Sequence, residues 1–157
     1  MTELHRVKVL GTGSYAPPKK LTNADFAKIV DTTDEWITTR SGIKERRIAE
    51  AGVAVSDLAL EASRKALQAA ELKPEDIDLI ILATSTPDRI VPPSAIYLQR
   101  KLGAFNAGAM DNIAACAGFT YALTNAWGQV AAGLSRRCLV VGTEELSKIT
   151  DYQDRST

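Results

Sequence analysis

The stretch DLIILATST, residues 78–86, decides the fold class of this protein. Its apolar residues are continuous instead of alternating with polar ones, and the run has the length of a strand. A strand with apolar side chains on both faces lies inside a layered structure, because helices must cover both faces of its sheet. The stretch therefore predicts a buried strand of a parallel sheet in an α/β protein.

Segments with helical and strand patterns alternate on both sides of this strand. The clearest helix is residues 56–72, where apolar residues recur at helical spacing and Ser56 is the expected N-cap. Thr22 or Asn23 is the expected cap of an earlier helix. The alternation predicts α/β layers around a largely buried sheet. The further predicted helices are residues 22–30, 92–104 and 116–134, and the further strands are residues 6–13, 107–115 and 137–145.

Composition limits the class of protein. The chain has 157 residues, 45% of them hydrophobic, which suffices for one sizeable core and predicts a single domain. Its 19 Lys and Arg residues balance 19 Asp and Glu residues, so net charge gives no reason to expect nucleic-acid or membrane binding. There is no apolar stretch of signal-peptide or membrane-span length, and Cys116 and Cys138 lack metal-ligand spacing. We expect a cytoplasmic protein with free thiols and no metal site.

Two glycine motifs resemble nucleotide-binding loops only in part. GTGSY, residues 11–15, follows a predicted strand but lacks the third glycine that opens the helix of a dinucleotide-binding loop. VVGTEE, residues 140–145, lacks the Lys-Ser/Thr pair of a phosphate-binding loop. We expect a tight turn at the first motif and the end of a strand at the second.

The segment NIAACAGFTYAL, residues 112–123, places Cys116 among alanines and Gly118 at the start of a predicted helix. Small neighbours leave the thiol reachable and let backbone N–H groups approach a developing oxyanion. A helix N-terminus also stabilises a thiolate, the nucleophilic form of cysteine. Cys116 is therefore a candidate nucleophile, with a small buried hydrophobe as the alternative. Cys138, inside the apolar CLVV, is expected to be structural.

Six motifs together resemble one family. They are GTGSY, TNADF, DTTDEWITTRSGIKERR, AACAGFTYAL, VVGTE and DYQDRST. From about Lys8 to Thr157 the chain resembles β-ketoacyl-acyl-carrier-protein synthase III, an acyltransferase of the thiolase-like condensing-enzyme superfamily that initiates type II fatty-acid synthesis. The resemblance implies two similar α/β halves packed as αβαβα layers, a homodimer, and residues 1–157 as the N-terminal half.

The resemblance also implies a mechanism. Cys116 matches the nucleophile that takes an acyl group, typically acetyl, from coenzyme A. The acyl-enzyme then condenses with malonyl-acyl-carrier protein, which loses carbon dioxide, so that two thioester steps replace one difficult condensation. Coenzyme A is thus a substrate carrier, and no separate cofactor is implied.

Four residues match the coenzyme A site of the family. Trp36 and Arg155 match the pair that sandwiches the adenine, while Thr32 and Arg40 match residues that contact the nucleotide and its phosphates. Indole and guanidinium planes can stack on a base, and Arg can bind phosphate oxygens in a bidentate manner. Without the resemblance, Trp36 would be interpreted as a core aromatic residue and Arg40, with its charged neighbours at 44–47, as a solvated face.

Phe119 and Val91 are the residues that the resemblance assigns to the acyl pocket. Many relatives carry a Phe before Pro-Ser that lines the pocket of the partner subunit, and an ungapped comparison places Val91 there. A shift of one residue would place Pro92 there instead. A smaller residue at this position would admit a longer or branched primer, so the primer stays open.

Other catalytic groups of the family lie outside this chain. The family uses a His and an Asn of its second half together with a further glycine N–H. The only histidine here, His5, precedes the first predicted strand at an end of the chain that is usually superficial. We expect either the first half of a longer protein or one of two associating chains. Three functions stay open: the synthase, a related acyl-coenzyme A condensing or acyltransferring enzyme of secondary metabolism, and a noncatalytic half that binds coenzyme A or a partner.

Overall fold

The computed structural model describes residues 4–154, and contacts divide the chain into two compact units. The larger unit contains the N-terminal segment up to Tyr15 and residues Ala54–Glu144. The smaller unit contains Ala16–Val53 and the segment that begins at Glu145. The single domain expected from the sequence stays a prediction.

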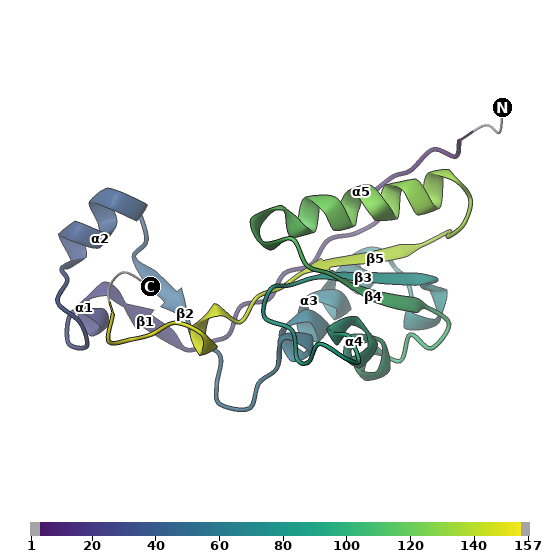
Figure 1. The fold of residues 1–157 in the computed structure, drawn as a ribbon. Helices are drawn as coiled ribbons and strands as arrows, with labels where there is room; N and C mark the ends of the chain where they lie inside the picture. The colour runs from purple at the N-terminus through teal and green to yellow at the C-terminus, as the bar shows by residue number, and fades with distance from the viewer. Residues whose placement is uncertain (1–3, 155–157) are drawn as a thin grey trace. The chain divides into compact units, whose positions relative to one another are not determined.

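A parallel sheet forms the centre of the larger unit (Figure 1). Its strand order is β4-β3-β5, and β3 pairs in parallel with both neighbours. All five residues of β3 are buried, which confirms the central strand predicted from the continuous apolar run. The strands are β3 (Leu79–Ala83), β4 (Gly108–Asn112) and β5 (Cys138–Gly142).

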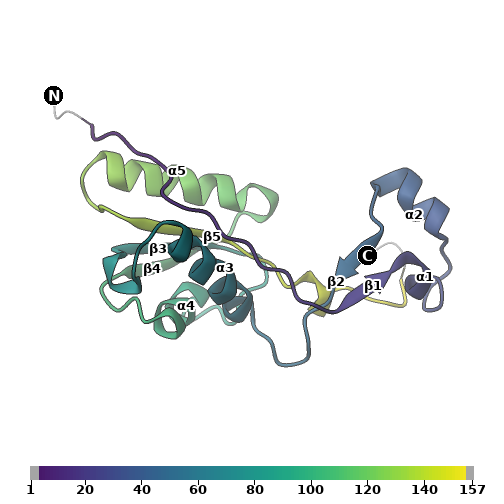
Figure 2. The same ribbon diagram turned by 180° about the vertical axis from the view of Figure 1, so that it is seen from behind.

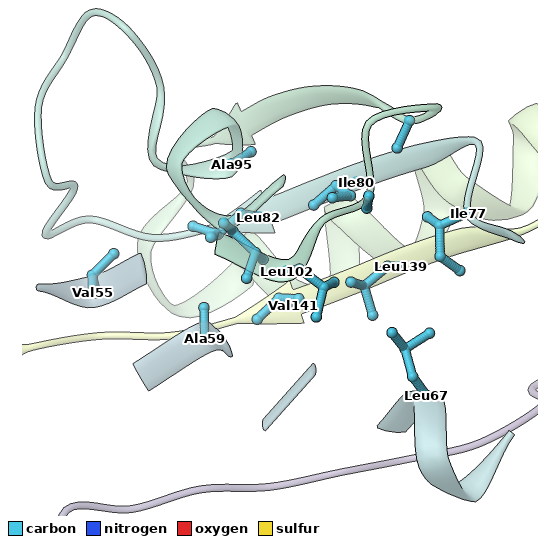
Figure 3. Packing of buried hydrophobic residues seen from close by; sticks show 13 residues of the cluster. Val55, Ala59, Leu67, Ile77, Ile80, Leu82, Ala95, Leu102, Leu139 and Val141 are labelled. Atoms are coloured by element: carbon cyan, nitrogen blue, oxygen red, sulfur yellow. The ribbon is translucent and has the colours of Figure 1, made fainter. Parts of the chain in front are cut away.

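Helices cover both faces of this sheet, as Figures 1 and 2 show from opposite sides. Ile80 and Leu82 point toward α3 and α4 and are fully buried in the main apolar cluster (Figure 3). Ile81 and Ala83 point the other way, toward Ala122 of α5. Successive side chains of a strand face opposite sides, so β3 supplies both cores. The helices are α3 (Val55–Ala69), α4 (Ser94–Leu102) and α5 (Gly118–Ala131), with a 3₁₀ turn η1 at Pro74–Asp76.

The expected N-cap of α3 is wrong. The helix begins one residue before Ser56, and Ala54 occupies the cap position. The carboxylate of Asp57 accepts a hydrogen bond from the Ala54 N–H at 2.9 Å and takes over the capping role. Ser56 is buried, and its N–H and hydroxyl both donate to Asp88. A serine at this place in the sequence could be an N-cap or a buried hydrogen-bond donor. The sequence pattern cannot distinguish the two, because the acceptor Asp88 lies 32 residues away.

The strand predicted at residues 6–13 and the tight turn at GTGSY are also wrong. Between residues 4 and 19 the described chain forms neither a helix nor a strand. A Cβ atom on Gly11 would lie 2.6 Å from the Ala66 oxygen, and one on Gly13 would lie 2.3 Å from the Ala62 oxygen. These glycines therefore let the N-terminal segment approach the backbone of α3, which is a packing requirement and not a turn.

The smaller unit has little secondary structure and few buried apolar residues. Thr22 caps α1 as predicted: its Oγ1 accepts from the Asp25 N–H at 3.2 Å, and the Asp25 carboxylate accepts from the Thr22 N–H. The helix is shorter than the predicted residues 22–30. Antiparallel strands β1 and β2 pair beside it. The elements are β1 (Lys20–Thr22), α1 (Asn23–Phe26), α2 (Asp34–Ser41), β2 (Glu45–Arg47) and the 3₁₀ turn η3 (Leu146–Lys148).

No helix in the described part of the chain is long and apolar enough to cross a membrane.

Candidate functional site

Cys116 lies on a turn between a strand and a helix. It occupies the middle of the 3₁₀ turn η2 (Ala115–Ala117), which lies between β4 and α5, and its side chain is exposed. Ala115 has a φ of 43°, a left-handed conformation that costs an alanine on the order of 1 kcal/mol. The predicted helix at residues 116–134 thus begins two residues later, and the thiol stands on the turn that precedes it.

Two residues next to the turn hold it against the sheet. The Nδ2 of Asn112, at the end of β4, donates to the main-chain oxygen of Gly118 at 2.9 Å. A Cβ atom at Gly118 would lie 3.3 Å from the Cβ of Ala83, so glycine allows the first turn of α5 to pack on β3. The small residues around Cys116 therefore serve packing as well as access to the thiol.

Polar side chains gather at the carboxyl ends of the three parallel strands, where α/β proteins commonly bind ligands. Asp111 accepts hydrogen bonds from the N–H groups of Ser94 and Ala95, both at 2.7 Å, and so caps α4. Glu144 accepts from the Ser85 N–H and the Thr86 hydroxyl, both at 2.7 Å. Sequence reasoning missed Asp111, Asn112 and Glu144, although their positions at strand ends were a usable signal.

Cys138 differs from Cys116 in exposure and in its surroundings. It is half-buried at the start of β5 and packs against the smaller apolar cluster, which agrees with its expected structural role. Burial raises the pKa of the Cys138 thiol, the charge of Asp78 raises it further, and a hydrogen bond with Ser135 acts in the opposite direction. Its thiolate fraction at neutral pH is therefore low.

The two residues expected in the acyl pocket are both solvent-accessible in this chain. Phe119, in the first turn of α5, is 50% exposed, and a Cβ atom on Gly142 would lie 3.1 Å from its ring. Val91 is 79% exposed in the loop between β3 and α4, next to a cis peptide bond to Pro92. Val91 is thus not enclosed by residues 4–154, and both pocket assignments stay predictions.

In the smaller unit, α2 carries two of the four residues expected to bind coenzyme A. The guanidinium of Arg40 lies over the Trp36 ring, 4.4 Å from its centroid. Thr33 fixes the helix start, since its Oγ1 accepts from the Trp36 N–H at 3.0 Å. The hydroxyl oxygen of Thr32 is buried without a hydrogen-bond partner among the described residues. Arg155, the fourth expected residue, lies outside the described residues.

The charged residues that follow α2 are not merely a solvated face. Arg46 donates to the Asn23 side chain, and its guanidinium lies over the Phe26 ring at 4.7 Å. Arg47 donates to the main-chain oxygen of Pro17 at 3.1 Å. These arginines hold the smaller unit together. Asn23, which sequence analysis considered only as a cap, is the most connected polar side chain that we find there.

No group of three or more His, Cys, Asp or Glu residues within 4–154 could hold a metal ion. The site is a reachable thiol on a strand–turn–helix junction of a parallel sheet with helices on both faces, which is an α/β arrangement. Its similarity to solved condensing-enzyme structures places the fold in the thiolase-like class.

Comparisons with known proteins give the family. Residues 110–157 match 3-oxoacyl-[acyl-carrier-protein (ACP)] synthase III. The whole chain is 55% identical to β-ketoacyl-[acyl-carrier-protein] synthase III of Caldanaerobacter subterraneus, of which it covers 47%. The crystal structure of the synthase III of Aquifex aeolicus matches 96% of the chain with a TM-score of 0.92 and 50% identity, over 48% of its own length. The priming β-ketosynthase of the R1128 polyketide pathway matches 99% of the chain with a TM-score of 0.95 and 42% identity, over 47% of its length.

The chain is therefore a homologue of β-ketoacyl-[acyl-carrier-protein] synthase III, and it spans about half the length of the curated relatives that it matches.

Proposed function

We propose that this chain supplies the acyl-accepting half of a condensing enzyme that transfers an acyl group, most simply acetyl, from coenzyme A to malonyl-acyl-carrier protein. The observation that carries the proposal is the exposed Cys116 on the turn between β4 and α5. All 157 residues of the chain that contains it align with synthase III. The product would be a β-ketoacyl-acyl-carrier protein that primes fatty-acid synthesis.

The first step is thioester exchange at Cys116. Its thiolate attacks the acyl carbonyl carbon, the bond from that carbon to the coenzyme A sulfur breaks, and coenzyme A leaves as a thiol after taking up a proton. Backbone N–H groups at the start of α5 are suited to stabilise the oxyanion that forms in between. The acyl group then rests on Cys116 as a new thioester.

The nucleotide of coenzyme A would bind to the smaller unit. Trp36 and Arg155 would stack on the adenine, and Arg40 would pair with a phosphate. The buried Thr32 hydroxyl has no partner among the described residues and can serve a ligand without breaking an internal hydrogen bond. An indole ring next to a guanidinium is a surface that suits a phosphorylated base.

The second step, condensation with loss of carbon dioxide, needs groups that we assign to the part of the family fold outside this chain. The apolar side chains of α5 that remain exposed give that part a surface to cover. They include Phe119, Tyr121, Leu123 and Trp127, which are 45 to 59% exposed. A homodimer, in which Val91 reaches the acyl pocket of the partner subunit, completes the proposal.

The test is to trap the acyl-enzyme. The full protein is incubated with radiolabelled acetyl-coenzyme A, and the label is mapped by peptide mass spectrometry. We expect the label on Cys116, its loss in Cys116→Ala and its retention in Cys138→Ser. Label on Cys138, or label that persists in Cys116→Ala, would remove the nucleophile from the proposal.

A second candidate is a starter-unit condensing enzyme of secondary metabolism. The close structural match to the R1128 priming ketosynthase favours it, because that match covers 99% of the chain. The two functions share the Cys116 chemistry and differ in primer and acceptor. Product identification with a set of acyl-coenzyme A primers, and with malonyl-acyl-carrier protein against malonyl-coenzyme A, separates them.

A further inference from the structure

A buried asparagine joins both ends of α2 in the smaller unit. Asn23, the first residue of α1, is only 1% exposed. Its Nδ2 donates to Oδ1 of Asp34 at 2.7 Å and to the main-chain oxygen of Ile43 at 2.8 Å. Its Oδ1 accepts from Nη1 of Arg46. Asp34 opens α2 and Ile43 follows its end, so one side chain fixes the helix on both sides.

The pattern of partners requires an amide. An asparagine side chain has two N–H donors and one carbonyl acceptor, and all three functions are used here. A carboxylate of the same size offers only acceptors, so it would face Asp34 and the Ile43 carbonyl without a hydrogen to donate. Buried polar groups that lose their partners destabilise the arrangement that buries them.

Within residues 16–53 and 145–154, few apolar side chains are buried that could fix the position of α2. Ile37 is its only buried hydrophobic residue within the described chain, so apolar packing contributes little. The helix carries Trp36 and Arg40, stacked on each other, between the two points that Asn23 holds. A displacement of α2 would therefore move both side chains together.

We infer that Asn23 is the positioning residue of the nucleotide-binding surface formed by Trp36 and Arg40. Its amide sets the place of α2 against α1 and β2 and so presents the two stacked side chains in one fixed geometry. The inference rests on the proposed function for the identity of the ligand, whereas the placement of α2 can be measured without any ligand.

The test uses Asn23→Asp in the full protein, which keeps the size of the side chain and removes both donors. We expect the Kd for coenzyme A, measured by calorimetry, to rise about tenfold or more. Acetylation of Cys116 by acetyl-coenzyme A should need a higher half-saturating concentration and reach an unchanged maximal rate. Acetylation by S-acetyl-N-acetylcysteamine, a thioester without the nucleotide, should keep its wild-type rate, which a general loss of structure would not allow.

A second readout follows α2 directly. The signal of Trp36 is the part of the tryptophan fluorescence that an added Trp36→Phe change removes, measured in the wild-type and in the variant background. Asn23→Asp should make this fluorescence more sensitive to acrylamide quenching. The matched control is Thr39→Ala on the same helix, whose hydroxyl donates only to main-chain oxygens of α2, and it should leave both readouts at wild type. Combining Asn23→Asp with Asp34→Asn restores a donor–acceptor pair and should recover part of the affinity.

The outcomes separate the two proposals. Wild-type affinity together with wild-type quenching in Asn23→Asp overturns the role of Asn23. If the wild-type protein binds no coenzyme A, the proposed function is overturned and the quenching comparison alone decides the role of Asn23. Should Asn23→Asp not fold, Asp34→Ala removes one partner of the same amide and is judged by the same two readouts.

Discussion

The two compact units of this protein are each stabilised internally by a different kind of interaction. The larger unit buries Ile80, Ile81 and Leu82 on the two faces of one strand, whereas the described part of the smaller unit buries Ile37 as its only hydrophobic residue. The smaller unit depends instead on Asn23 and Arg46, through directed hydrogen bonds. Apolar burial is non-directional, whereas each hydrogen bond needs a matched donor and acceptor in a defined orientation.

In the proposed function, each unit has a separate task that suits the way in which the unit is stabilised. Covalent chemistry at Cys116 would take place on a turn supported by an apolar sheet core. Recognition of a polar nucleotide would take place on α2, whose placement is set by polar contacts. The larger unit thus provides most of the apolar core, and the smaller unit provides the polar contacts that place α2. We expect substitutions in one unit to change the stability of the fold and substitutions in the other to change binding.

The largest expected effect is on the apolar core. Leu82→Ala in β3 removes a fully buried side chain and should lower the free energy of unfolding by about 2 to 5 kcal/mol in denaturant titration. Leu134→Ala makes the same chemical change at a residue that is 74% exposed and should stay within ~0.5 kcal/mol of wild type. Equal losses in both variants would contradict the assigned core.

A hydrogen-bonded cap in the same unit should matter less than the core. Asp111→Ala leaves the buried N–H groups of Ser94 and Ala95 without their acceptor and should cost about 2 kcal/mol of unfolding free energy. Asp111→Asn keeps one side-chain oxygen as an acceptor and should lose less. If Asp111→Asn is as unstable as Asp111→Ala, charge instead of hydrogen bonding holds α4.

In the smaller unit the expected effect falls on binding. Trp36→Ala should weaken coenzyme A binding roughly tenfold in calorimetry, because stacking of a base on an aromatic ring contributes about 1 to 3 kcal/mol. Trp127→Ala removes the other tryptophan, which is 54% exposed on α5, and should leave the affinity unchanged. Unchanged affinity in a folded Trp36→Ala variant would assign Trp36 to structure alone.

The smallest expected effect is a pH dependence of the α1 cap. A hydrogen bond from the Thr22 side chain, followed by one from Lys28, lowers the pKa of Asp25 from 3.8 to about 2. Because the folded pKa is the lower one, the stabilisation is present above pH ~3.8 and is lost as the pH falls toward about 2. An NMR titration of the Asp25 carboxyl should show the low pKa, and Thr22→Val should raise it toward 3.8. A titration that Thr22→Val does not move would exclude the hydrogen bond that the Thr22 hydroxyl donates to the Asp25 carboxylate as the cause.

Local patterns in the sequence predicted the parts of the fold that depend on which face of an element is buried. The continuous apolar run of β3 and the periodic apolar face of α3 were both found in this way. The same reasoning pointed to Cys116, because its small neighbours in the chain are themselves local information. The tight turn expected at residues 11–15 was wrong because glycines in sequence indicate a turn and a close approach equally well.

By itself, the sequence determined the α/β class, the buried central strand and the candidate thiol, since periodicity and residue size are properties of neighbouring residues. Only the tertiary structure decided the roles of Ser56, Asn23 and Asp111. Their partners lie between 11 and 32 residues away, and hydrogen bonds over such separations form only when folding brings the segments together. Sequence patterns predicted no helix over Asp34–Ser41, which carries Trp36 and Arg40. The position of this helix is set by an amide that sequence reasoning could assign only to a cap.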